Sequence, residues 1–188
     1  SCVIDADKLA HKLMEPGRET HAAVVRRFGE KVLKSDGSID RARLGDAVFS
    51  DADLLRDLEQ IVHPAVVEEA RRRVVACPES VAVIEAIKLL EAEMHRDCDA
   101  VWVVWCRRCQ QVDRLVNHRQ MSIEAAELRI DAQSSQKAKC QRADVVIDNS
   151  GDLEKTWRQV LSAWGGIPNV THREAMPSWR DVAKRRTG

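Results

Sequence analysis

The sequence lacks an excess of charge of either sign, because its 188 residues carry 30 lysines plus arginines and 30 aspartates plus glutamates. Net charge therefore gives no reason to expect a nucleic acid partner. A long hydrophobic run is also missing, since the longest apolar stretches, near residues 101–105, are far shorter than the ~20 residues that span a bilayer. No secretory signal is visible. We expect no membrane partner and a cytoplasmic location.

Cysteine occurs at six positions, but the sequence lacks a second close pair. Cys106 and Cys109 form a single Cys-x-x-Cys, whereas a structural zinc site needs a further pair of Cys or His ligands. A strand-to-helix turn is the simpler interpretation of this pair. Without a secretory signal, we expect the thiols to be reduced. The six residues are Cys2, Cys77, Cys98, Cys106, Cys109 and Cys140.

Apolar runs that predict strands alternate along the chain with stretches that predict helices. Hydrophobic residues make up 44% and charged residues 32%, as in a folded globular domain. Parallel strands that are buried on both faces have apolar runs without alternation, and such runs occur here. The alternation predicts an α/β fold with a parallel sheet. The predicted strands are residues 2–5, 81–85, 101–105 and 144–148.

Capping and breaking signals predict where the helices begin and end. Ser50 resembles an N-cap, and His63-Pro64 is expected to end the helix that follows it and to start another. Asp36-Gly37 predicts a tight turn of the kind that closes a hairpin. Gly165-Gly166 is expected to end the last helix. Further helices are predicted at residues 107–117, 122–133 (with Ser122 as N-cap) and 152–164.

Two acids, Asp5 and Asp7, stand where the first predicted strand runs into a helix. Ligands of open α/β sheets bind at the carboxyl ends of the strands, so a carboxylate is well placed there for chemistry. On a strand, residues two apart share a face. An alternative role for Asp7 is to cap the helix that follows, and one residue could serve both purposes.

Several short motifs follow one another along the chain. Each is a weak signal for a protein family by itself, but the whole set in this order is a specific one. They are Ile4-Asp5-Ala6-Asp7, Glu15-Pro16-Gly17, Asp36-Gly37-Ser38-Ile39-Asp40-Arg41, His63-Pro64-Ala65-Val66, Ala132-Gln133 and Ala143-Asp144-Val145-Val146-Ile147-Asp148-Asn149-Ser150-Gly151. In this order the chain resembles the dephospho-CoA kinase family over about residues 3–164. The resemblance implies a three-layer P-loop kinase-like fold with a parallel sheet, a helical substrate insert and a lid. It also implies transfer of the γ-phosphoryl group of ATP to the 3′-hydroxyl of dephospho-CoA, with Mg²⁺.

The resemblance implies roles for three acids. Asp7 matches the family's catalytic acid that accepts the hydroxyl proton or orients the hydroxyl group, and Asp5, which precedes it in the same motif, is expected to be catalytic as well. Glu85 would lie at a strand tip, where an acid manages Mg²⁺ directly or through water.

On the dephospho-CoA side, the resemblance implies a set of binding residues for which structural alternatives stay open. His63-Pro64 matches a family motif but could also be a simple helix break, and Arg41 and Arg43 could bind phosphates or form a solvated face. Leu89 and Leu90 belong to a stretch that aligns with the family after the third strand.

On the ATP side, the resemblance implies a lid that starts near Arg114. The family's second lid arginine falls at His118, so either Arg119 replaces it or the lid is weakened. Lys139 and Arg142 match basic positions, and Asn149 lies in a loop near adenine or is only a turn residue. The expected boundaries are a kinase-like domain at 1–164, an insert at about 15–77, a lid at about 114–142 and a mobile tail at 165–188.

The sequence contains no Gly-x-x-x-x-Gly-Lys-Ser/Thr motif, which holds phosphates through backbone N–H groups in P-loop kinases. The family carries this motif on the central strand and helix that would precede Asp5. We therefore expect the chain as written to lack that first strand and to be inactive by itself. The alternative is a non-catalytic protein that binds CoA, a nucleotide or a partner chain.

Overall fold

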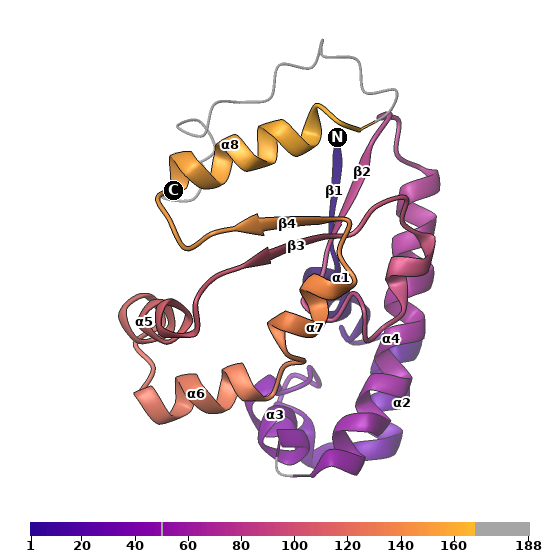
Figure 1. The fold of residues 1–188 in the computed structure, drawn as a ribbon. Coiled ribbons are helices and arrows are strands. Elements are labelled where there is room, and N and C mark those ends of the chain that lie inside the picture. Colours follow the sequence, from indigo (N-terminus) through magenta and orange to yellow (C-terminus); the bar gives the residue numbers. More distant parts are fainter. Residues whose placement is uncertain (50, 168–188) are drawn as a thin grey trace. The chain divides into compact units, whose positions relative to one another are not determined.

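The computed structural model describes residues 1–49 and 51–167 (Figure 1). The chain divides into two units, Ser1–Arg96 and Asp97–Gly188, and each is described by itself. The predicted tail lies almost wholly outside the described residues. In the described part of the chain, no helix is both long enough and apolar enough to cross a membrane.

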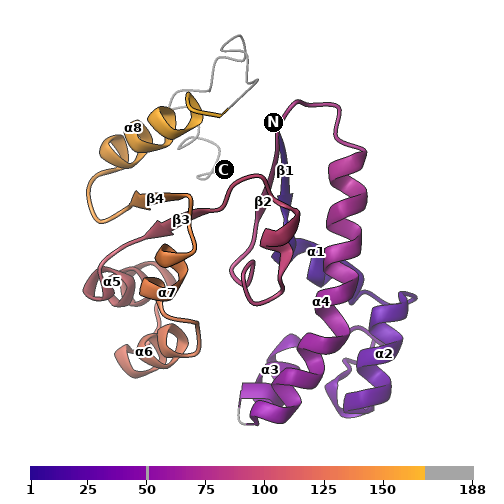
Figure 2. The ribbon, with the colours of Figure 1, turned by 45° about the vertical axis from the view of Figure 1, so that its right-hand side comes forward.

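The first unit, which we call unit 1, contains two strands and several helices. The long helix α4 runs along this unit in both views (Figures 1 and 2). The elements are β1 (Cys2–Asp5), α1 (Ala6–Leu13), α2 (Glu19–Phe28), η1 (Glu30–Val32), α3 (Arg41–Phe49), α4 (Ala52–Val75), β2 (Ala82–Glu85) and η2 (Met94–Asp97), the last at the boundary between the units.

The second unit, unit 2, has two further strands and four helices in its described part. They are β3 (Trp102–Trp105), α5 (Arg108–Arg119), α6 (Ile123–Asp131), α7 (Gln136–Gln141), β4 (Val145–Asp148) and α8 (Leu153–Trp164). The N-cap predicted at Ser122 is confirmed, because its side chain accepts a hydrogen bond from the N–H of Ala125 at 3.2 Å. Capping of this kind fixes the start of a helix by satisfying an amide that has no helical partner.

All four predicted strands form, and they pair in parallel, so the predicted α/β class is confirmed. They form two two-stranded sheets, β1 with β2 in unit 1 and β3 with β4 in unit 2. The predicted burial of both strand faces is wrong at several positions. Ile4 is only 3% exposed and packs on the core, whereas Val3, on the opposite face of β1, is 66% exposed.

The core of unit 1 lies where β1, α1 and α4 pack together. Buried apolar side chains from these elements include Ile4, Leu9, Val62, Val66 and Ala70. Burying each large side chain contributes about 1.5–3 kcal/mol. This packing fixes β1 and α1, and therefore the acids at the junction between them.

Helix α4 corrects two of the sequence predictions. Its N-cap is Asp51, whose carboxylate accepts hydrogen bonds from the N–H groups of Asp53 and Leu54 at 2.8 and 3.2 Å. The helix also continues through Pro64, where the sequence predicted a break. Proline removes one helical hydrogen bond, the one to the carbonyl of residue 60. Burial of Val62 and Val66 on either side of the proline favours a continuous helix.

The turn predicted at Asp36-Gly37 is confirmed as part of a small hairpin. Leu33 and Ile39 form an antiparallel bridge around it, and the N–H of Lys34 donates to the carbonyl of Ser38 at 2.8 Å. Gly37 has a φ of 78°, a conformation that side chains disfavour and glycine adopts readily.

A disulfide joins Cys2 to Cys77, so the expectation of reduced thiols is wrong for this pair. Cys2 begins β1, and Cys77 follows the end of α4. Their separation of 75 residues hides the pairing from the sequence, but the fold brings their Cα atoms to 6.2 Å. The other four cysteines are not in a disulfide, and burial raises the pKa of the Cys106 thiol.

Candidate functional site

The junction of β1 and α1 places Asp5 and Asp7 in different roles. Asp5 is the N-cap of α1, where its Oδ1 accepts a hydrogen bond from the N–H of Lys8 at 2.9 Å. Its Oδ2 lies 2.9 Å from the ammonium nitrogen of Lys8. The amide of Lys8, followed by its ammonium group, lowers the pKa of Asp5 below its ordinary value of 3.8. Asp5 is therefore held as a carboxylate by the start of the helix.

Asp7 lies in the first turn of α1, so it does not share a strand face with Asp5 as predicted. The alternative role of N-cap is also wrong for Asp7, because Asp5 holds that position. Asp7 is exposed, and its carboxylate has no hydrogen bond or ion pair within residues 1–49 and 51–167. An acid in this position is free to accept a proton from a bound hydroxyl group.

Glu85 ends β2 directly beside Asp5, because the two residues are register partners in the parallel pair. Both stand at the carboxyl ends of their strands, and Glu85 is exposed. Lys8 lies near both carboxylates, since Asp5, and to a smaller extent Glu85, raises the pKa of Lys8. In the part of the chain that the structure describes, no three acidic, His or Cys side chains converge as metal ligands. Two carboxylates still fit an ion that arrives with a phosphate, because Mg²⁺ often takes one or two protein carboxylates.

Arg41 lies against α1 on the same side as Asp7. Its Nη1 is 3.2 Å from both ring nitrogens of His11. His11 follows Asp7 by four residues, a spacing that puts two side chains on one face of a helix. The contact therefore brings a guanidinium group to the face of α1 that carries the free carboxylate.

Arg43 contacts residues of the hairpin that precedes α3. Its Nη1 donates to the carbonyl of Leu33 at 3.2 Å, and its Nε lies 3.5 Å from a carboxylate oxygen of Asp40. The structure thus gives Arg43 local partners, and binding of a phosphate by this residue stays a prediction.

His63 is half-buried in the middle of α4 and lies close to the segment that follows β2. Burial lowers the pKa of His63 below its ordinary value of 6.5, while Glu59 acts in the opposite direction and Lys88 adds to the lowering. Lys88 and Glu59 form an ion pair that links this segment to α4. The fold therefore brings His63 together with the stretch that contains two other predicted binding residues.

Those two residues, Leu89 and Leu90, are half-buried, and Leu89 packs against the core of unit 1. Pro64 is exposed on α4. All three lie in unit 1 with His63.

In unit 2, Arg114 and Asn149 are in direct contact. Nη2 of Arg114 donates to the carbonyl oxygen of Asn149 at 2.8 Å. The N–H of Asn149 donates to the carbonyl of Trp105 at 2.8 Å, and its Oδ1 accepts from the hydroxyl of Thr156 at 3.1 Å. Asp148 accepts from the N–H of Ser150 at 2.8 Å, so the turn chemistry weighed for this loop is present.

The other residues predicted to bind ATP lie at the ends of two helices of unit 2. His118 and Arg119 are both exposed at the end of α5, and Gln120 after them is left-handed, with a φ of 53°. Lys139 is in the last turn of α7, and Arg142 is its C-cap.

Neither the role of Lys8 nor the pairing of Glu59 with Lys88 was predicted from the sequence. Asp5 and Lys8 are three residues apart at the start of a helix, and this spacing is a signal from which the contact of Lys8 with Asp5 could have been predicted. The pair of Glu59 and Lys88 joins residues that are 29 positions apart, and a single sequence contains no signal for it.

Comparison with known proteins decides the family. The sequence model described as dephospho-CoA kinase matches residues 1–155. A dephospho-CoA kinase from Symbiobacterium thermophilum is 43% identical over 167 residues, which are 87% of this chain and 70% of that protein. The chain belongs to the dephospho-CoA kinase family. A further dephospho-CoA kinase, from Leifsonia xyli, is 39% identical over 171 residues, or 89% of this chain and 86% of that one.

Solved structures agree with the assignment to the dephospho-CoA kinase family at the level of the fold. The crystal structure of TT1252 from Thermus thermophilus matches with a TM-score of 0.75 and 27% identity over 89% of this chain and 85% of that one. The dephospho-CoA kinase from Campylobacter jejuni matches with a TM-score of 0.59 and 24% identity, covering 87% of this chain and 83% of that chain. The predicted resemblance is therefore confirmed.

Proposed function

We propose that this protein transfers the γ-phosphoryl group of ATP to the ribose 3′-hydroxyl of dephospho-CoA, the last step of coenzyme A synthesis. One observation carries the proposal: Asp7 is exposed and without a bonded partner among the described residues, at the junction of β1 and α1. Membership of the dephospho-CoA kinase family supports dephospho-CoA as the substrate at that carboxylate.

In the proposed reaction, the 3′-oxygen of dephospho-CoA forms a bond to the γ-phosphorus of ATP. The bond from that phosphorus to the bridging oxygen breaks, and ADP leaves with the electron pair. The carboxylate of Asp7 accepts the hydroxyl proton. Such transfers depend on positioning and on cations that stabilise the charge of the phosphoryl oxygens.

Different residues are proposed for the two substrates. The assignment of residues to dephospho-CoA is best supported for Arg41, because its contact with His11 puts its guanidinium group on the Asp7 face of α1. The dephospho-CoA side is proposed to use His63, Pro64, Arg41, Arg43, Leu89 and Leu90. The ATP side is proposed to use Arg114, His118, Arg119, Lys139, Arg142 and Asn149.

We propose that Glu85 holds Mg²⁺, either directly or through water, and that the catalytic acid Asp5 lies beside the ion. Their adjacent positions at the carboxyl ends of β1 and β2 support this assignment. When bound, the ion neutralises phosphate charge. Lys8 now pairs with Asp5, so an ion at Asp5 would have to displace that ammonium group.

The domain boundaries are also a proposal, with a kinase-like domain at 1–164, an insert at about 15–77 and a lid at about 114–142. A cytoplasmic location remains a prediction.

The test is to incubate the protein with ATP, Mg²⁺ and dephospho-CoA and to measure CoA and ADP by chromatography and mass spectrometry. Equal amounts of both products support the proposal, and the analogue of dephospho-CoA that lacks the 3′-hydroxyl is the control. The natural protein and the 188-residue polypeptide should be assayed side by side, because the polypeptide alone is predicted to be inactive. Binding of both substrates by the natural protein without any turnover would favour the non-catalytic alternative.

A further inference from the structure

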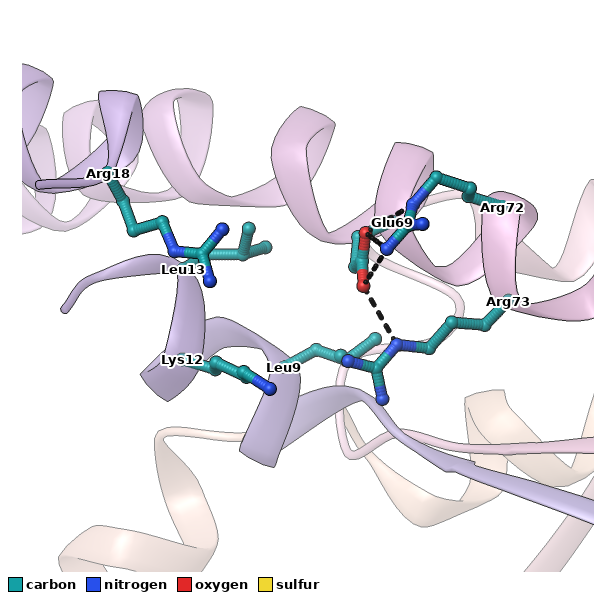
Figure 3. A pocket seen from close by; sticks show the side chains of 7 residues that line it. All are labelled: Leu9, Lys12, Leu13, Arg18, Glu69, Arg72 and Arg73. Atoms are coloured by element: carbon teal, nitrogen blue, oxygen red, sulfur yellow. Dashed lines mark hydrogen bonds and ion pairs between the residues drawn. The ribbon is translucent and has the colours of Figure 1, made fainter.

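A hollow in unit 1 gathers positive charge between the ends of α1 and α4 (Figure 3). Four cationic side chains line it, together with one carboxylate, so its net charge is three positive. We call it the basic hollow. Its charged residues are Lys12, Arg18, Glu69, Arg72 and Arg73.

The single carboxylate orders two of the four cations. Glu69 accepts hydrogen bonds from Nε and Nη2 of Arg72, both at 2.9 Å, and from Nε of Arg73 at 2.9 Å. Hydrogen bonds from Arg73, and then from Arg72, lower the pKa of Glu69 below its ordinary value of 4.5. Glu69 therefore stays charged at neutral pH, and it holds both guanidinium groups in place while neutralising only one of them.

The other two cations, Lys12 on α1 and Arg18 at the N-cap of α2, also line the basic hollow. Figure 3 shows the ammonium group of Lys12 and the guanidinium group of Arg18 extending toward Glu69 and Arg73. Neither side chain has an ion pair or hydrogen bond with any described residue. Their charges are therefore not compensated within this part of the protein.

Apolar side chains form the rest of the lining, and the space is small. Leu9, which is 2% exposed, and Leu13 line the hollow beside the cations. Its volume is about 130 Å³, suited to a group of the size of a phosphate or pyrophosphate. Arginine pairs presented side by side bind phosphate oxygens through several charge-assisted hydrogen bonds.

The basic hollow lies on a different face of α1 from Asp7. At about 100° per residue, Leu9, Lys12 and Leu13 lie roughly 140–240° around the helix axis from Asp7. His11 and Arg41 are on the Asp7 side, as described above. The hollow is thus separate from the face that carries the proposed proton acceptor.

We infer that the basic hollow is a second anion-binding site, which takes a phosphate group at Lys12, Arg18, Arg72 and Arg73. The site is independent of the phosphoryl transfer proposed above and uses none of its residues. The phosphate belongs either to a free inorganic ion or to a phosphorylated small molecule, because the same donors would recognise both.

Titration of the ¹⁵N-labelled protein with inorganic phosphate, pyrophosphate and adenosine 3′,5′-bisphosphate tests the inference. Amide shifts are expected to centre on the ends of α1 and α4, and higher salt should weaken binding because the attraction is electrostatic. The tightest of the three probes identifies the source of the phosphate. Shifts confined to other elements, or no saturable binding of any probe, would overturn the inference.

A double variant, K12Q/R18Q, removes the two cations that have no partner and leaves the Glu69 cluster intact. We expect it to weaken binding about tenfold or more, as the loss of charged hydrogen bonds implies. The matched control is R26Q/K31Q, which removes two exposed charges from α2 and η1. If both variants weaken phosphate binding equally, the probes are attracted by the overall charge of the protein and not by the basic hollow. If K12Q/R18Q does not weaken binding, these two cations only stabilise a helix end. Either result contradicts the inference.

Discussion

The carboxylate of Asp5 contacts both the backbone N–H and the ammonium group of Lys8, each at 2.9 Å. This double contact gives the two acids of the Asp-x-Asp motif different roles. Asp5 starts α1 and pairs with Lys8, whereas Asp7, two residues later, is left exposed. The proposed proton transfer therefore depends on the second acid, which the first helps to keep in position.

Substitution of Asp7 by Asn in the natural protein should lower kcat for dephospho-CoA about 10²–10⁴-fold, because a general base of this kind contributes that much. The fold should be retained, since the side chain has no bonded partner in the described residues. Steady-state assays and thermal melting measure the two effects. A variant that keeps its kcat would remove Asp7 from the mechanism.

The comparison variant is Asp5→Ala. It removes the N-cap of α1 and the partner of Lys8, so it should lower the melting temperature, which Asp7→Asn should leave nearly unchanged. Circular dichroism melting of both variants measures this contrast. Equal melting temperatures would mean that Asp5 does not stabilise the helix.

His63 should make the protein less stable in mild acid. Because burial lowers the pKa of His63 below 6.5, the unfolded chain binds the proton more readily, and stability should fall as the pH drops below that value. Urea unfolding at about pH 7.5 and pH 5.5 measures the change, and His63→Gln should reduce it. Asp5 affects stability in a different pH range, because its lowered pKa gives stability that is lost only as the pH falls below 3.8.

The exposed His118 supplies the control for this experiment. His118→Gln should leave the pH dependence as it is in the unaltered protein. If both histidine variants behave alike, burial of His63 is not the cause of the acid sensitivity.

Arg114 should contribute to the stability of unit 2. Arg114→Ala leaves the carbonyl of Asn149 without its guanidinium donor, and it should lower the free energy of unfolding by about 1–2 kcal/mol. Chemical denaturation monitored by tryptophan fluorescence measures this, since β3 contains Trp102 and Trp105. Unchanged stability would show that the contact contributes little.

Arg119, rather than His118, should be the cation that contacts ATP from the end of α5. Arg119→Ala should raise the KM for ATP about tenfold, the loss expected for one charge-assisted hydrogen bond. His118→Ala should change KM little, because an imidazole lacks the fork of donors with which a guanidinium group binds phosphate. The reverse order of effects would assign the role to His118.

Replacement of Pro64 by Ala should stabilise α4. The new N–H can bond to the carbonyl of residue 60, and removal of a proline from a helix interior stabilises the folded state by up to about 3 kcal/mol. Loss of the proline also gives the unfolded chain more conformational freedom, which reduces this gain by up to about 1 kcal/mol. Thermal melting measures the gain. Pro64→Gly should gain less, because glycine costs about 1 kcal/mol in a helix. A rise in the KM for dephospho-CoA in both variants would support contact between Pro64 and the substrate.

Local signals in the sequence predicted most of the secondary structure. The cap at Ser122 and the turn at Gly37 depend on a few neighbouring residues, and both form as predicted. Pro64 and Asp51 show the limit of such signals. Packing of α4 against α1 overrides the local preference for a break, and a carboxylate one residue further along replaces the predicted cap.

Contacts between distant residues could not be predicted from one sequence. The pair of Asp5 and Glu85 depends on the strand register, and the contact of Arg41 with His11 depends on how α3 packs near α1. The resemblance to the family did assign roles to Asp5, Arg41 and Glu85. It could not show that Asp5 caps the helix, or which cations already have protein partners.

The disulfide between Cys2 and Cys77 makes residues 2–77 a covalently closed ring. The ring contains α1, α3 and α4, and therefore Asp7, Arg41 and His63. A protease that cuts once inside the ring, for example at the exposed Asp36, opens the backbone but releases no fragment. The cut protein would migrate as one species under non-reducing conditions and separate into two only after reduction.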